Sequence, residues 1–105
     1  MIIQGKVAEI LESNKLLQEV HVKGWVRSFR SNRFIALNDG STINNLQCVI
    51  DFEKFNEDLL KRITVGAAIH VKGILQESLG SGQKVEIQVN SVEILGEANV
   101  GFLQE

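Results

Sequence analysis

The chain has 105 residues, of which 44% are hydrophobic and 23% are charged, and its formal net charge is −2. This length and composition indicate one globular domain and exclude an intrinsically disordered chain. The apolar runs are too short to span a membrane, and the first residues lack the pattern of a signal peptide. A single cysteine cannot form an internal disulfide, which favours a cytoplasmic location.

The first half of the chain is predicted to form one short helix and three strands. The segment KVAEILES, residues 6–13, places Val7, Ile10 and Leu11 at the spacing of an amphipathic helix. Alternation of apolar and polar residues then predicts strands over residues 20–30, 34–38 and 45–50. Gly24 interrupts the first of these strands, and we expect a β-bulge there that lets the strand coil round a small barrel.

The second half is predicted to form a helix and two further strands. Apolar residues from Phe52 to Ile63 follow helical spacing, and Asn56 is the expected N-cap. Strands are predicted over residues 68–76 and 84–89, the second resuming after a slip of parity at Asn90-Ser91. Gly80-Ser81-Gly82 is predicted to be the loop between them.

The order of these elements predicts the fold. We expect an all-β, five-stranded OB-fold, which is a Greek-key barrel, with a short N-terminal helix and a helix between strands three and four. Residues 1–105 then form a single domain. Within it, residues 1–18 form a helical extension and residues 97–105 form a tail without clear periodicity.

A basic stretch lies on the predicted strands. Between Val20 and Asn38 there is no acidic residue, and there are four cations: Lys23, Arg27, Arg30 and Arg33. A positive patch on an otherwise acidic domain attracts a polyanion.

The outward face of strands two and three carries residues suited to unpaired bases. Phe34 offers a surface on which a base can stack. Gln47 offers an amide that can hydrogen-bond a base edge. Arg30 and Arg33 at the adjoining turn, with Arg27 on the first strand, can hold phosphates or stack on bases. Together these five residues predict a site for single-stranded nucleic acid.

The residue types by themselves leave other readings open. A sequence-tolerant single-strand binder and an OB domain used for protein contacts both remain possible on this pattern. A stand-alone enzyme has the least support, because no nucleophile–base pair, metal cluster or nucleotide-binding loop is present in the sequence. Cys48 shares the parity of core residues and is expected to be buried, and His21 and His70 are not expected to bind a metal.

Three short segments of the sequence resemble segments of a known family. They are GWVR at residues 24–27, FIALNDGS at residues 34–41 and LQ at residues 46–47. They resemble the N-terminal anticodon-binding domain of the asparaginyl-tRNA synthetases, a group that also contains the aspartyl- and lysyl-tRNA synthetases. The string LNDGS followed by LQ favours the asparagine member, and the later GQKVEIQ strand extends the resemblance over most of the chain.

The resemblance implies specific roles for the outward residues. It implies that Phe34 stacks on anticodon bases, that Gln47 hydrogen-bonds the central uridine, and that Arg30 contacts anticodon nucleotides with Arg27 nearby. The sequence departs from the family pattern at Phe29 and Ser31 and in a shortened turn between Arg30 and Phe34. Phe29 is expected either to add a stacking surface or to pack against that turn.

The resemblance also implies partners and cofactors. The expected partner is the anticodon loop of tRNA(Asn), with no DNA and no membrane, and the parent enzyme is expected to be a homodimer. The chain alone carries no catalytic site or cofactor. ATP and Mg²⁺ are expected to bind in a catalytic domain that this sequence does not include.

Overall fold

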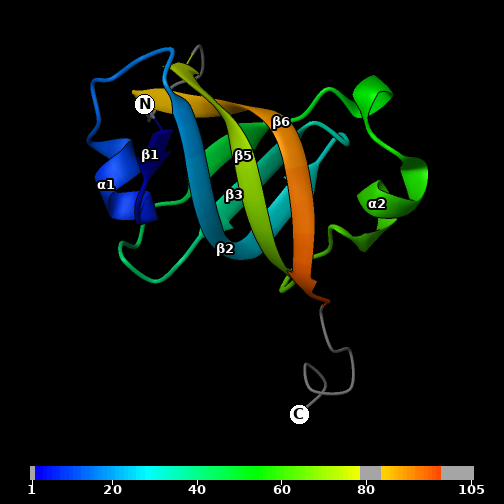
Figure 1. Ribbon diagram of the computed structural model, residues 1–105. Helices are drawn as coiled ribbons and strands as arrows, with labels where there is room; N and C mark the ends of the chain where they lie inside the picture. The colour runs from blue at the N-terminus through cyan, green and yellow to red at the C-terminus, as the bar shows by residue number, and fades with distance from the viewer. Residues whose placement is uncertain (1, 79–83, 98–105) are drawn as a thin grey trace.

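The computed structural model describes residues 2–78 and 84–97, and its strands form a closed barrel (Figure 1). The elements in chain order are β1 (Ile2–Gln4), α1 (Val7–Leu11), β2 (Glu19–Arg30), β3 (Phe34–Asn38), β4 (Leu46–Val49), the 3₁₀ helix η1 (Phe52–Lys54), α2 (Glu57–Arg62), β5 (Ala68–Glu77) and β6 (Val85–Gly96). The predicted loop at Gly80-Ser81-Gly82 and most of the predicted tail lie outside the described residues.

Five strands make the barrel wall, in the order β2-β3-β4-β6-β5, and pairing of β2 with β5 closes it. All neighbouring pairs in the wall are antiparallel except β4 and β6, which run parallel. The OB-fold prediction is therefore confirmed. The sheet has one strand more than predicted, because β1 pairs in parallel with the start of β2. Three residues are too few to show the alternation by which a strand is recognised in a sequence.

The parity predicted for the strands describes the core correctly. Side chains on the inward parity of β2, β3, β4, β5 and β6 are buried, and the helices add Val7 and Ile10 from α1. Cys48 is fully buried among them, as expected. Burial of this small, continuous apolar cluster is the main stabilising contribution to a domain of this size.

The bulge predicted at Gly24 is wrong, because the register of β2 against β3 shifts at Arg27 instead. Gly24 has a different role, since a Cβ atom there would lie 2.5 Å from the carbonyl oxygen of Asn38. The glycine therefore permits close approach of two backbones where β2 turns from β5 toward β3. The parity slip predicted at Asn90-Ser91 is confirmed by a register shift between β6 and β5 at that point.

A polar turn between β3 and β4 ties three parts of the chain together. The Asn38 side chain donates to the carbonyl oxygens of Thr42 and Asn44, each at 3.2 Å, and accepts from the Gly40 amide at 2.7 Å. The Asp39 carboxylate accepts from the Val7 amide at 2.9 Å, at the start of α1. A side chain from another part of the chain thus satisfies an unpaired amide at the N-terminus of this short helix.

The two helices lie on opposite sides of the barrel (Figure 1). The predicted N-cap of α2 is confirmed, because the Asn56 side chain accepts a hydrogen bond from the Asp58 amide at 2.7 Å. Acidic residues occupy the first turn of α2 and basic residues its last turn, which complements the helix dipole.

Candidate functional site

The outward parity of β3 and β4 carries Phe34 and Gln47, as predicted. Residues paired across the two strands are Phe34 with Val49 and Ala36 with Gln47, and all four are partly exposed. Ile35, which lies between Phe34 and Ala36, points the other way and is fully buried. The alternation of the strands therefore fixes the side chains of Phe34 and Gln47 on the outer surface of the barrel.

A tight turn joins β2 to β3 and places two arginines beside this surface. Ser31 and Asn32 both have positive φ angles, 57° and 51°, and the Arg33 amide donates to the Arg30 carbonyl at 3.0 Å. The Arg33 carbonyl in turn accepts from the Ile50 amide at 2.7 Å, just after β4. The shortened turn is thus fixed by backbone hydrogen bonds at both sides.

These residues line one hollow of about 670 Å³, which we call the groove. Its lining consists of Arg30, Ser31, Arg33, Phe34, Gln47, Val49, Gln76, Glu86 and Gln88. Four of the five predicted site residues, which are scattered over 18 positions from Arg30 to Gln47, meet there. Arg27 does not line the groove. It is exposed at the bulge of β2.

The two groove arginines are open to a ligand. Both are exposed, and within the described residues neither guanidinium forms an ion pair. In the part of the chain that the structure describes, no carboxylate is therefore paired with either charge, although Glu86 lines the same groove. Guanidinium groups placed beside an exposed aromatic ring can hold a phosphate or stack on a base.

Glu86 forms the floor of the groove and holds two amide side chains. It is only 6% exposed, and its two oxygens accept hydrogen bonds from the Nε2 atoms of Gln47, at 3.0 Å, and Gln76, at 2.7 Å. A carboxylate only accepts hydrogen bonds, so it fixes which end of the Gln47 amide faces it. Bonds to an ionised acceptor are also stronger than bonds between neutral groups.

Sequence reasoning missed Glu86, Gln76 and Gln88. Glu86 and Gln88 do alternate with apolar residues along the last strand, and this pattern could have indicated that both lie on the same face. Their nearness to Gln47 depends on the parallel pairing of β6 with β4, which joins positions about 40 residues apart, such as Cys48 and Ile87. No local pattern encodes that pairing.

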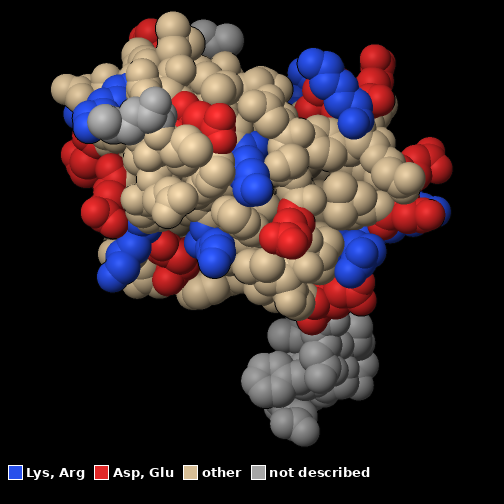
Figure 2. All heavy atoms as spheres, viewed as in Figure 1, with Lys and Arg blue, Asp and Glu red and all other residues tan. Residues whose placement is uncertain are grey.

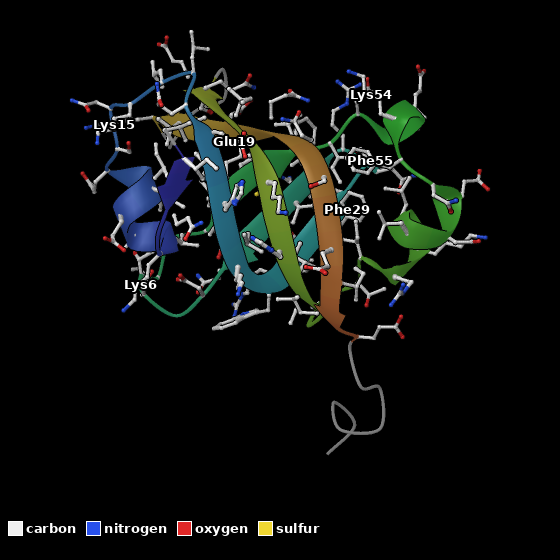
Figure 3. The ribbon with its side chains drawn as sticks, viewed as in Figure 1. Lys6, Lys15, Glu19, Phe29, Lys54 and Phe55 are labelled. Atoms are coloured by element: carbon white, nitrogen blue, oxygen red, sulfur yellow. The ribbon has the colours of Figure 1, made fainter. Side chains whose placement is uncertain are left out.

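Phe29, one of the departures from the family pattern, packs toward the core. It pairs with Ile35 across the β2–β3 hairpin and is partly buried against the core cluster. Figure 3 shows Phe29 and Phe55 on the side of the barrel that faces η1 and α2. Phe29 is absent from the groove lining, so it adds no stacking surface there, and it packs against the core cluster, whereas packing against the shortened turn was the other expectation.

Comparisons with known proteins agree with this geometry. A family model described as "OB-fold nucleic acid binding domain" matches residues 20–95. Asparagine–tRNA ligases of Bacteroides fragilis and Parabacteroides distasonis are 48% and 52% identical to this chain, each over 90% of it and 21% of their own length. The chain thus spans about a fifth of these relatives.

A solved structure shows the same fold. Asparaginyl-tRNA synthetase of Entamoeba histolytica, in complex with asparaginyl-adenylate, superposes with a TM-score of 0.75 at 22% identity, over 97% of this chain and 25% of that one. The predicted resemblance to the anticodon-binding domain of the asparaginyl-tRNA synthetases is confirmed by these matches. No helix among the described residues is long and apolar enough to cross a membrane.

Proposed function

Because this chain belongs to the family of OB-fold nucleic acid binding domains, we propose that it binds the anticodon loop of tRNA(Asn) as the anticodon-binding domain of an asparagine–tRNA ligase. The observation that carries the proposal is the groove itself. It brings Arg30, Arg33, Phe34 and Gln47 together on one face. Recognition of single-stranded RNA needs a stacking surface, an oriented amide and exposed cations, and the groove supplies all three.

Each groove residue has a distinct role in this proposal. The Phe34 ring stacks on an anticodon base, and Gln47, held by Glu86, hydrogen-bonds the edge of the central uridine. Arg30 and Arg33 contact the phosphates or bases that flank it. Arg27 lies outside the groove and contributes at most to the field that attracts the RNA.

The parent enzyme is part of the same proposal. Its activity is the ATP-dependent joining of asparagine to tRNA(Asn), with ATP and Mg²⁺ bound in a separate catalytic domain. We place this enzyme in the cytoplasm as a homodimer. The present chain supplies recognition of the anticodon and no catalytic group.

Binding of an anticodon stem-loop RNA to single variants tests the proposal. We expect Phe34→Ala to weaken binding by about 1–3 kcal/mol, the value of one stacked base. Gln47→Ala should chiefly reduce the preference for uridine over cytidine at the central position, because a base-edge contact determines specificity.

A matched control is available in Phe52, which is 44% exposed on η1 and does not line the groove. Phe52→Ala should leave RNA binding unchanged. Equal losses for the Phe34 and Phe52 variants would show that the groove is not the binding site. Equal competition by random single strands would instead favour a sequence-tolerant binder.

A further inference from the structure

A second polar hollow, of about 370 Å³, lies on the barrel surface at β1, β2 and β5. Its lining includes Lys6, Lys23, Asp39, His21 and His70, and we call it the histidine hollow. It shares no residue with the groove. Among the described residues that line it there is no aliphatic side chain and no phenyl ring, so the hollow suits a small charged ligand better than a stacked base.

The two histidines face each other across neighbouring strands. The rings of His21 on β2 and His70 on β5 lie edge to face, with centroids 5.8 Å apart and planes at 77°. Their side chains are only 15% and 16% exposed. Both imidazoles are therefore held in place at the wall of the hollow.

Basic residues are paired with basic residues over this part of the sheet. The register places His21 opposite Lys72 and His70 opposite Lys23. Like charges directly opposite each other on a sheet destabilise it, so this arrangement carries an electrostatic cost whenever the histidines are protonated. Figure 2 shows separate Lys and Arg side chains over the face of β2 and β5, with acidic side chains between and beside them.

The nearby carboxylates only partly balance these cations. Glu19 contacts the His21 ring at 2.5 Å, and Glu93 on β6 lies 3.7 Å from Nδ1 of His70. Asp39 is already committed to hydrogen bonds from the Val7 amide and from Ser41.

The lysines around the hollow lack partners. Lys6, Lys23 and Lys72 form no ion pair within the part of the chain that the structure describes. Lys6 and Lys23 line the hollow, and Lys23 and Lys72 lie opposite the two histidines on the neighbouring strand, so within the described residues these three ammonium groups remain available to an anion.

The environment of His70 shows the same imbalance. Its pKa is lowered from 6.5, first by burial and then by the charges of Lys72 and Lys23, with a smaller contribution from His21. A hydrogen bond with Glu93 acts in the opposite direction and does not outweigh them. The charges around the ring therefore oppose a further positive charge, and a bound anion would relieve that opposition.

We propose that the histidine hollow is a second anion-binding site, separate from the groove, that binds a phosphate group. The ammonium groups of Lys6 and Lys23 supply charge, and the ring nitrogens that do not face Glu19 or Glu93, namely Nδ1 of His21 and Nε2 of His70, supply directed donors. The phosphate comes either from a small phosphate ester or from the backbone of an RNA.

NMR titration of the histidine rings tests this directly. The chain is titrated with inorganic phosphate, and a parallel sample receives sodium chloride at matched ionic strength. We expect the ring resonances of His21 and His70 to shift to saturation with phosphate and not with chloride. Sulfate, which stays divalent across this range, should bind more tightly at about pH 6 than at about pH 8 and should raise the pKa of His70.

Two lysine variants provide the matched comparison. Lys23→Gln should weaken phosphate binding about two- to five-fold, as expected for an exposed ion pair. Lys61→Gln on α2 removes the same charge away from the hollow and should leave binding unchanged. Equal weakening by both variants, or shifts that match those in chloride, would overturn the proposal.

The source of the phosphate is decided with the Phe34→Ala variant, in which groove binding is reduced. Histidine shifts on adding a short single-stranded RNA to this variant identify an RNA backbone phosphate. Shifts with inorganic phosphate alone identify a small phosphate ester. Because the hollow and the groove share no residue, failure here leaves the anticodon proposal standing, and the reverse also holds.

Discussion

Replacing Glu86 with glutamine should release the amide of Gln47 while leaving the barrel folded. In the structure the two carboxylate oxygens of Glu86 accept from Gln47 at 3.0 Å and from Gln76 at 2.7 Å. A glutamine has an NH₂ group in place of one of these two oxygens, so one of the two donors then faces another donor instead of an acceptor. The bond from Gln76 is the shorter, and we expect the bond from Gln47 to be lost.

The expected loss of binding free energy equals the cost of ordering the Gln47 side chain, which RNA binding must then supply. Fixing a glutamine side chain that has lost its hydrogen bond to residue 86 costs up to about 1.5–2 kcal/mol. We therefore expect Glu86→Gln to weaken binding of a cognate anticodon stem-loop by about 1–2 kcal/mol, which is about 5- to 30-fold. Stacking on Phe34 does not depend on this network, so binding to a cytidine-substituted loop should fall less than binding to the uridine loop.

Fluorescence anisotropy with labelled stem-loops carrying uridine or cytidine at the central position measures this ratio. The matched control is Glu93→Gln, which makes the same change of charge on β6 at a side chain that is 70% exposed and outside the groove. An unchanged uridine preference in a folded Glu86→Gln protein would refute the positioning role of Glu86. So would an equal loss of preference in the control.

Three further outcomes follow from the barrel. Gly73→Ala should lower the free energy of unfolding in urea by about 1–3 kcal/mol or more, because the new Cβ atom would lie 2.2 Å from the Gln88 carbonyl oxygen. The control Gly96→Ala should change it little, because the nearest atom to that Cβ would be 3.9 Å away. The pKa of Asp39 is lowered from 3.8, since hydrogen bonds from Ser41 and from a helix amide outweigh the opposing effect of burial. Its contribution to stability is therefore present above pH 3.8 and is lost as the pH falls through the lower folded-state pKa, and Asp39→Asn should flatten that part of an acid-unfolding curve. Burial, together with the charge of Glu86, raises the pKa of the Cys48 thiol to about 12. A thiol reagent should therefore react with Cys48 only as fast as the protein unfolds locally. Rapid reaction of the folded protein would contradict this expectation.

The family resemblance rests on sequence segments whose residues stabilise the fold as well as line the groove. In the LNDGS segment, Leu37 is a core residue, Asn38 holds the β3–β4 turn and Asp39 is bonded to the start of α1. The resemblance therefore depends largely on residues that stabilise the fold. The predicted site residues Phe34 and Gln47 lie within the segments FIALNDGS and LQ, and strand parity places their side chains on the outer face of the barrel.

Local sequence determined the strands, the N-cap of α2 and the outward direction of Phe34 and Gln47, because a period of two residues and a capping side chain are properties of neighbours in the chain. It also predicted a bulge at the wrong residue, because Gly24 is needed for an approach to Asn38 that only the folded barrel creates. Tertiary structure alone decided that Glu86 lies under Gln47, that Arg27 stays outside the groove, and that His21 meets His70. Each of these depends on register between strands distant in sequence, which barrel closure sets and no local pattern records.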